Sequence, residues 1–225
     1  MSHYFSRVKL VDWPQDMALL AMLSRHGSAY RDHALIWRLF SDTAAERDFI
    51  FRHEHGAHGQ GIYYIVSQRE PQLDPGLFEV QTKVYEPRLA IGEWVRFDLR
   101  ANPTVARRGP SDKNSKRHDV LMEAKIKCAD LPQAQHIDFI QNAAIEWIVA
   151  RAERWGLRLD PEHVSMDGYT QHKLQHKQRN IEFSSLDYKG VAQVQDDGLL
   201  LRVLLDGVGH ARAFGCGLML VRRLE

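Results

Sequence analysis

The chain has 225 residues, of which 44% are hydrophobic and 26% charged, and its formal net charge is +1 at pH 7. These values are ordinary for a globular protein, and the length is enough for one large domain or two small ones. No apolar run is long enough to span a membrane, and the N-terminus lacks the layout of a signal peptide. Cys128 and Cys216 are too few for a disulfide framework or a cysteine zinc site, so we expect a reduced, cytoplasmic protein.

The first ninety residues predict a strand, two helices and three further strands. Alternating residues indicate the opening strand, and apolar residues at helical spacing indicate the helices, the second of which Ser28 can cap. Ala34, Trp37 and Phe40 are the expected inward residues of that second helix. The predicted elements are the strand 4–10, the helices 16–25 and 29–40, and the strands 47–55, 60–68 and 78–87.

The second half repeats this order. The strand 93–105 alternates between an apolar and a charged face, and Pro132 opens a long amphipathic helix that Gly156 ends. The expected inward residues of that helix are Ile137, Ile140, Ala144, Ile148 and Ala152. The other predicted elements are a basic loop 106–118, strands at 120–128, 162–169, 181–194 and 217–224, and a helix at 196–207.

Both halves therefore fit the βαββαβ order of the split ferredoxin-like unit. We predict an α+β protein of two tandem ferredoxin-like (RRM-like) domains that meet near residues 86–93. The first domain, residues 1–90, carries the helix 29–40. The second domain, residues 91–225, carries a basic hairpin and a glycine-rich loop.

Histidines are the first candidates for a metal site. His53, His55 and His58 lie close together in the sequence, and such a group can bind zinc. No HExxH motif, cysteine pair or carboxylate-rich partner accompanies them, so an exposed strand end is the favoured interpretation. His172 and His176 lie in a basic hairpin, which argues against a shared site. A phosphate-binding loop and a dinucleotide fingerprint are also missing, so we expect no metal and no cofactor.

Acid–base chemistry without a metal is the remaining enzymatic possibility. Tyr30 and His33 are three residues apart in a predicted helix, so they face the same way. A histidine that titrates near neutrality can give or take a proton, and a tyrosine hydroxyl can hold a phosphate oxygen. The spacing alone is also that of ordinary packing or surface residues.

Two basic islands indicate a surface that binds phosphate groups. Residues 171–180 contain two lysines, an arginine and two histidines without an acid, and the stretch 100–127 has eight basic residues against three acidic ones. A solvated loop is the alternative for either island alone. The candidate binding residues are Lys173, Lys177 and Arg179 in the first island, and Arg100, Arg107, Arg108, Lys113, Lys116 and Arg117 in the second.

The stretch 207–217, GVGHARAFGCG, places four glycines between a predicted helix and the last strand. Glycine in such a place marks a turn or a backbone that comes close to another group. Exposed amides of such a loop can hold phosphate, whereas the alternative is a tight structural junction. The candidate binding residues in this glycine-rich loop are Gly207, Gly209, Arg212, Gly215 and Gly217.

Together these motifs resemble the CasE-type CRISPR repeat endoribonucleases, which process RNA within the Cascade surveillance complex. The resemblance rests on the opening strand 4–10, on YRDHALIWRLF (30–40), on VRFDLRANPTV (95–105) and on GVGHARAFGCGLMLV (207–221). It extends with gaps over nearly the whole chain, and the separated motifs occur in the family's order.

The resemblance implies that His33 is the catalytic histidine and Tyr30 its partner. The implied substrate is the hairpin of a CRISPR repeat transcript, cut on the 3′ side of its stem without a metal to leave a 2′,3′-cyclic phosphate. It implies RNA contacts for the basic islands and the glycine-rich loop, with Lys173 or Lys177 near the cut phosphate. The implied partners are the pre-crRNA or crRNA hairpin and the other Cascade subunits, with no membrane.

Three alternatives stay open. The chain has extra residues before Tyr30 compared with shorter family members, so His26 is a rival for the catalytic histidine. Arg100 and Asn102 can serve the structure instead of RNA, since Pro103 ends their strand. The rival to an enzyme is a non-catalytic subunit of the same superfamily that only holds the crRNA.

Overall fold

The computed structural model describes residues 2–11, 21, 28–40, 46–56, 60–72, 74, 76–109, 113–176 and 179–224; for residues 28, 175, 176 and 179 it describes the backbone only. The predicted helix 16–25 lies outside the described residues apart from Ala21. His26, His58 and Lys177 also lie outside them.

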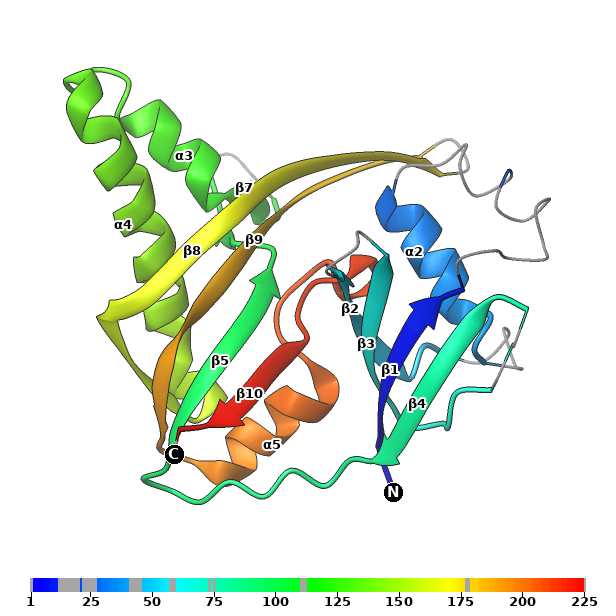
Figure 1. Ribbon diagram of the computed structural model, residues 1–225. Coiled ribbons are helices and arrows are strands. Elements are labelled where there is room, and N and C mark those ends of the chain that lie inside the picture. The colour runs from blue at the N-terminus through cyan, green and yellow to red at the C-terminus, as the bar shows by residue number, and fades with distance from the viewer. Residues whose placement is uncertain are drawn as a thin grey trace. The chain divides into compact units, whose positions relative to one another are not determined.

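The first sheet contains four antiparallel strands in the order β2-β3-β1-β4 (Figure 1). This is the strand order of a ferredoxin-like domain, in which β1 and β3 are central. The helix α2 (Ser28–Trp37) connects β1 to β2. The strands are β1 (Tyr4–Leu10), β2 (Phe49–His55), β3 (Gly61–Ser67) and β4 (Phe78–Val84).

The second sheet has the corresponding order β10-β5-β9-β8, with helices again in the connections. Its strands are β5 (Trp94–Ala101), β8 (Leu157–His176), β9 (Arg179–Val194) and β10 (Met219–Arg223). The connections contain α3 (Val120–Lys127), α4 (Gln133–Ala152), the 3-10 helices η1 (Glu153–Trp155) and η2 (Arg212–Phe214), and α5 (Asp197–Asp206). The prediction of two tandem ferredoxin-like folds is confirmed.

The apolar residues of α2 pack against the first sheet. Leu35, Ile36 and Leu39 are fully buried and pack in one core with residues of the first sheet. The helix ends at Trp37, three residues before the predicted end. The next residues form tight turns, in which the amide of Phe40 donates to the carbonyl of Trp37 at 3.1 Å.

The prediction of a strand at 120–128 is wrong, because these residues form α3. The side chain of Asp119 caps the helix by accepting a hydrogen bond from the amide of Met122 at 2.9 Å. Leu121, Ala124 and Cys128 are buried at helical spacing. The apolar run therefore has the period of a helix rather than that of a strand.

The long predicted helix is confirmed as α4 and η1, which Gly156 ends in a left-handed conformation (φ 73°). Its expected inward face is correct only in its second half, where Ala144, Ile148 and Ala152 are buried. Ile137 is 66% exposed. Figure 1 shows that the first half of α4 lies beside the short helix α3.

The strand 93–105 is divided at Asn102 and Pro103. Its first part, β5, alternates as predicted, with Val95, Phe97 and Leu99 fully buried. The expected basic loop contains a two-stranded hairpin of β6 (Thr104–Arg107) and β7 (Lys116–Asp119).

The contacts divide the chain into two compact units that are not continuous in sequence. The first consists of Met1–Arg88, His172–Glu182 and Leu201–Met219, and the second of Leu89–Gln171, Phe183–Leu200 and Leu220–Glu225. The end of the β8–β9 hairpin and the glycine-rich loop therefore belong to the same unit as α2. The domain limits at residues 90 and 91 stay a prediction. Within the described part of the chain, no helix is both long and apolar enough to cross a membrane.

Candidate active site

His33 lies on α2 and is half-buried within the first unit. Its Nδ1 lies 2.9 Å from the carbonyl oxygen of Ala213 in η2, and its Nε2 lies 3.2 Å from the indole nitrogen of Trp37. The ring of Phe214 lies 5.9 Å away, between centroids. These contacts bring the histidine of α2 against the glycine-rich loop, which is 180 residues distant in the sequence.

These two hydrogen bonds assign the protonation of the ring. A carbonyl oxygen only accepts, so Nδ1 of His33 carries the proton and donates to Ala213. An indole nitrogen only donates, so Nε2 accepts from Trp37 and carries no proton. In this arrangement His33 is neutral, with Nε2 as its basic nitrogen.

Tyr30 lies one helical turn before His33, as the spacing predicted. Its ring centroid is 6.4 Å from that of the histidine, and the side chain is half-buried. Tyr30 and His33 therefore lie on one face of α2, where both can reach a group that contacts this face.

A buried cluster fixes α2 on the first sheet. Asp32 is 6% exposed and accepts a 2.8 Å hydrogen bond from the hydroxyl of Tyr63 on β3. The other oxygen of its carboxylate lies 3.0 Å from Nδ1 of His53 on β2. Burial, followed by the charge of Asp32, raises the pKa of Tyr63 well above its usual value, so this hydroxyl keeps its proton and donates.

This cluster corrects the interpretation of the histidines 53, 55 and 58 as an exposed strand end. The side chain of His53 is only 16% exposed, and it stacks on Tyr63 with 4.6 Å between ring centroids. His55 is exposed and His58 lies outside the described residues. Among the described residues, no group of three or more His, Cys, Asp or Glu side chains is placed to hold a metal ion.

The glycine-rich loop folds back on itself at its two ends. The amide of Val208 donates to the carbonyl of Gly217 at 2.9 Å. Gly217 has φ 91°, and a Cβ atom there would lie 2.4 Å from the carbonyl oxygen of Val208. Gly207 has φ 72°, and its Cβ would lie 2.9 Å from a side-chain carbon of Ile50 on β2. These two glycines allow the loop to close on itself, and in this closed loop the carbonyl oxygen of Ala213 contacts His33.

Of the other predicted residues of this loop, Gly209 is exposed, Arg212 is half-buried and Gly215 is buried. Arg212 is half-buried, and its Nη1 donates to the carbonyl of Asp206 at 2.8 Å. No heavy atom lies within 4 Å of a Cβ built on Gly209, and Gly215 has Phe51 as its nearest neighbour at 3.5 Å. Gly209 is thus the predicted glycine with the most open surroundings for a ligand.

The basic hairpin is formed by the ends of β8 and β9, as predicted. Lys173 is 77% exposed and lies 3.8 Å from the carboxylate of Glu182 across the hairpin. The backbone of Arg179 belongs to β9. An exposed pair of this kind holds Lys173 only weakly, so the lysine can exchange this partner for a phosphate.

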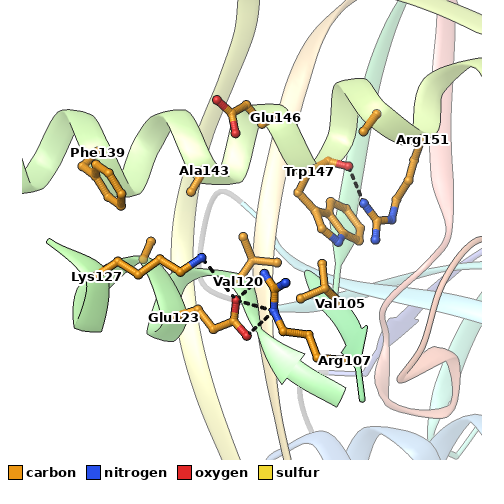
Figure 2. A pocket seen from close by; sticks show the side chains of 12 residues that line it. Val105, Arg107, Val120, Glu123, Lys127, Phe139, Ala143, Glu146, Trp147 and Arg151 are labelled. Atoms are coloured by element: carbon orange, nitrogen blue, oxygen red, sulfur yellow. Dashed lines mark hydrogen bonds and ion pairs between the residues drawn. The ribbon is translucent and has the colours of Figure 1, made fainter. Parts of the chain in front are cut away.

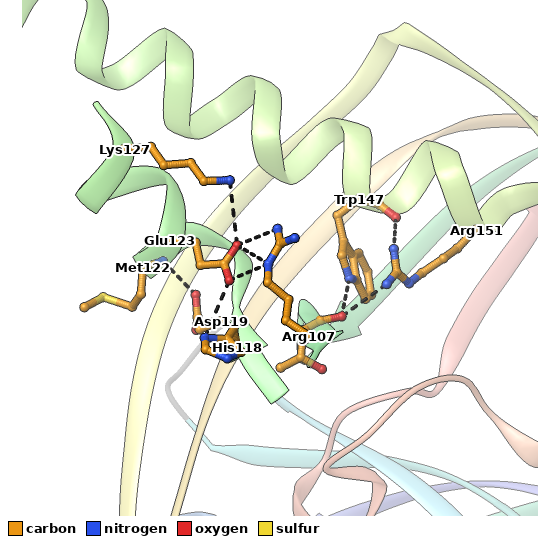
Figure 3. A network of polar contacts seen from close by, with 9 residues as sticks. Arg107, His118, Asp119, Met122, Glu123, Lys127, Trp147 and Arg151 are labelled. Carbon is orange, nitrogen blue, oxygen red and sulfur yellow. Dashed lines mark hydrogen bonds and ion pairs between the residues drawn. The ribbon is translucent and has the colours of Figure 1, made fainter. Parts of the chain in front are cut away.

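The hairpin β6–β7 carries the second basic island, and one of its members is engaged within the protein. Figure 3 shows Arg107 against the carboxylate of Glu123 on α3, with hydrogen bonds of 2.7 Å from both Nε and Nη2. Arg107, through these bonds, lowers the pKa of Glu123. Figure 2 shows the pair in the wall of a pocket of about 370 Å³ between the hairpin, α3 and α4. The remaining predicted residues are exposed: Arg108, Lys113, Lys116 and Arg117.

Arg100 and Asn102 have structural partners on β9. Arg100 forms two 2.7 Å hydrogen bonds with the carboxylate of Asp187, its cross-strand neighbour. Asn102 is 6% exposed and donates to the carbonyl of Ser184 at 2.7 Å. The sequence left a structural role open for both residues, and these contacts favour it.

Trp37, Asp32 and Tyr63 are residues of the candidate site that the sequence did not assign. Trp37 was expected to face inward only as a packing residue. Its position four residues after His33 is the one signal that links it to the histidine. Tyr63 is separated from Asp32 by 31 residues, and nothing in the sequence pairs them.

Comparisons with known proteins identify the family of this chain. A family model described as "CRISPR associated protein" matches residues 4–223. The CRISPR system Cascade subunit CasE of Escherichia coli (strain K12) is 28% identical over 202 residues, which cover 84% of this chain and 89% of that protein.

Solved structures show the same fold. Thermus thermophilus Cse3, bound to an RNA representing a pre-cleavage complex, superposes with a TM-score of 0.71 at 23% identity. That match covers 99% of this chain and all of the other. Cas6e from Escherichia coli K-12 has a TM-score of 0.62 at 22% identity, over 98% of this chain and all of that one. The resemblance to CasE-type proteins is confirmed, and the chain belongs to the family of CRISPR associated proteins.

Proposed function

We propose that this protein is an endoribonuclease that cleaves the hairpin of CRISPR repeat RNA and retains the product as a Cascade subunit. The observation that carries the proposal is the environment of His33, a neutral histidine held by Ala213 and Trp37 with Tyr30 on the same helix face. The relatives support it, because Cse3 is named an endoribonuclease and is bound to RNA.

The reaction that suits this site is attack by the 2′-hydroxyl on the adjacent phosphorus. The bond between the 2′-oxygen and phosphorus forms as the bond from phosphorus to the 5′-oxygen breaks, which leaves a 2′,3′-cyclic phosphate and a 5′-hydroxyl. The 2′-hydroxyl loses a proton, and the 5′-oxygen gains one. Because the nucleophile belongs to the RNA, the protein has to supply alignment, proton transfer and charge stabilisation.

His33 suits the proton transfers. Nε2 of the neutral ring carries no proton, so once its contact with Trp37 opens it can accept the proton of the 2′-hydroxyl, and once protonated the same nitrogen can supply a proton to the 5′-oxygen. The hydrogen bond from Nδ1 to Ala213 holds the ring and stabilises the positive charge of the protonated form. Tyr30, on the same face of α2, can hold a phosphate oxygen beside it. No step of this scheme needs a metal.

Basic side chains of the first unit supply the binding energy for the RNA backbone. Lys173 on the β8–β9 hairpin and Arg212 in the glycine-rich loop belong to the same unit as His33. An A-form stem is recognised mostly through its phosphates and 2′-hydroxyls, which these side chains can contact. The cytoplasmic location stays a prediction from the sequence.

The proposal is tested with the cognate repeat RNA in excess EDTA, followed by identification of the product ends. We expect one cut at the 3′ base of the stem, with a 2′,3′-cyclic phosphate and a 5′-hydroxyl. A repeat RNA with a single 2′-deoxynucleotide 5′ to the cut should bind as tightly and stay intact, because it lacks the nucleophile. Cleavage of this RNA, or cleavage that requires an added metal, would contradict the mechanism. Tight binding of the unmodified RNA without a cut would favour the non-catalytic subunit.

A further inference from the structure

Arg47 lies two residues before β2, and no ion pair joins it to a carboxylate among the described residues. It is half-buried, and its Nη1 is shielded from solvent with no hydrogen-bond partner among the described residues. The next residue, Asp48, is engaged by Arg69, whose Nε and Nη2 donate to its carboxylate at 2.7 and 2.8 Å. Of the two acids next to Arg47 in the sequence, Asp48 is therefore engaged by another arginine, and Glu46 is exposed.

The 3-10 helix η2, which begins at Arg212, contacts β2 within the first unit and so brings a second guanidinium close to Arg47. Burial, followed by the positive charge of Arg212, lowers the pKa of Arg47. Arg212 donates to the carbonyl of Asp206, a neutral acceptor that leaves its charge uncompensated. In the part of the chain that the structure describes, no carboxylate forms an ion pair with either arginine. Two positive charges close together repel each other, and an N–H group shielded from water without a partner adds a further cost. Binding of an anion between the two arginines would offset both costs.

The two arginines are connected to both sides of His33. Arg212 immediately precedes Ala213, the residue whose carbonyl accepts the Nδ1 proton of His33. Arg47 comes two residues before Phe49, whose ring packs edge-on against Trp37 with 5.1 Å between centroids. Trp37 in turn donates to Nε2 of the histidine. All of these residues belong to one unit.

We propose that Arg47 and Arg212 together bind one phosphodiester group of the RNA beside His33. This inference rests on the proposed function and adds Arg47 to its binding site. A phosphate presents several oxygens to two guanidinium groups, so it satisfies Nη1 of Arg47 and removes the repulsion between the arginines. The same pair stabilises the additional negative charge that develops on a phosphate during cleavage.

The first test uses inorganic phosphate and needs no RNA. We compare the thermal unfolding of the wild type, Arg47→Gln and Arg202→Gln in phosphate and in chloride at equal ionic strength. Arg202 is an exposed arginine of α5 in the same unit and is the matched control. Phosphate should raise the unfolding temperature of the wild type and of Arg202→Gln but not that of Arg47→Gln. In chloride, Arg47→Gln should be as stable as the wild type, because the change removes an unpaired charge. An equal response to phosphate in all three proteins would overturn the anion site.

The second test uses the repeat hairpin with a 2′-deoxynucleotide at the cut, which stays intact. Arg47→Gln should weaken its binding about tenfold and reduce the slope of log affinity against log salt by about 0.7 to 0.9, the loss of one phosphate contact. Arg202→Gln should change neither.

A series of single neutral methylphosphonates in this hairpin then locates the phosphate. At one position the substitution should weaken binding to the wild type but not to Arg47→Gln. If the wild type binds the hairpin and no position shows this coupling, Arg47 does not contact the RNA, whatever the phosphate test shows. If the wild type binds no hairpin, the proposed function fails, and the first test still decides whether the arginines form an anion site.

Discussion

The indole N–H of Trp37 donates to Nε2 of His33 at 3.2 Å, one helical turn along α2 from the histidine. The hydrogen bond opposes protonation of this nitrogen, because a protonated Nε2 can no longer accept it. Proton uptake by His33 must therefore break the contact with Trp37. The position of the indole and the protonation of the histidine are coupled.

Replacing Trp37 by Phe removes the donor and keeps an aromatic ring against Phe49. We expect the neutral ring of His33 to lose part of its preference for a proton on Nδ1, which ¹⁵N NMR of the imidazole nitrogens reports directly. Because the tautomer with its proton on Nε2 cannot accept the proton of the 2′-hydroxyl, the rate of cleavage should fall, while the affinity for the uncleavable hairpin stays within about twofold. Unchanged ¹⁵N shifts would show that Ala213 alone fixes the ring.

His33→Ala should lower the single-turnover rate of cleavage by about 10²- to 10⁴-fold, which is the usual contribution of one acid–base group. Binding of the hairpin should stay within a few-fold of the wild type, because the phosphate contacts come from other residues. His53→Ala is the informative comparison, since that histidine contacts Asp32 and not the reacting groups. It should act mainly on stability. Cleavage at the normal rate by His33→Ala would remove this residue from the mechanism and return attention to His26.

Much of the fold was predictable because its elements have clear periods. The alternation of β5 and the apolar residues of α4 gave the correct element types from local sequence. The error at α3 shows where this fails. A run of eight residues fits either element, and the capping bond from Asp119 that distinguishes them is a property of side-chain geometry.

The candidate site was predictable where its residues share one helix turn, as Tyr30 and His33 do. Contacts between distant segments were not. The hydrogen bond from His33 to Ala213 joins residues 180 positions apart, and it forms through a backbone carbonyl that any residue carries. The proximity of Arg47 to Arg212 likewise depends on how β2 and η2 pack.

The two ends of the glycine-rich loop allow a direct test of its structural role. Gly217→Ala should destabilise the protein by about 3 kcal/mol or more. The new methyl group would overlap the carbonyl of Val208, and the alanine backbone would have to keep the positive φ of Gly217. Gly209→Ala has the same backbone problem in open space, so its cost should be about 1 kcal/mol. Chemical denaturation measures both. Equal losses would mean that the close approach at Gly217 has little energetic importance.

The β8–β9 hairpin can be tested through the charge pair at its end. Lys173→Ala should weaken binding of the hairpin RNA and flatten its salt dependence, because one phosphate contact is lost. Glu182→Gln should have the opposite effect on affinity, since it releases Lys173 from its acidic neighbour. Binding titrations over a salt series measure both changes. Identical slopes for both variants and the wild type would place this hairpin outside the RNA-binding surface.

The pair formed by Asp48 and Arg69 predicts a pH-dependent contribution to stability. The hydrogen bonds from Arg69 lower the pKa of Asp48 below its usual value. The folded state therefore binds a proton at this carboxyl less readily than the unfolded state does. The stabilisation is fully present above the unfolded pKa of about 3.9 and is lost as the pH falls through the lower folded value.

Asp48→Asn should accordingly be less stable than the wild type at pH 7, by about 1 kcal/mol for a partly exposed pair. The difference in unfolding free energy between the two proteins should shrink as the pH is lowered from about 5 to 2, because a protonated Asp48 is neutral, like the asparagine of the variant. Glu86→Gln is the matched control, since Glu86 forms an ion pair of which both members are well exposed. It should differ from the wild type by less than about 0.5 kcal/mol at every pH. Urea titrations at each pH measure these differences, and a constant gap between Asp48→Asn and the wild type would mean that its cause is packing rather than the ion pair.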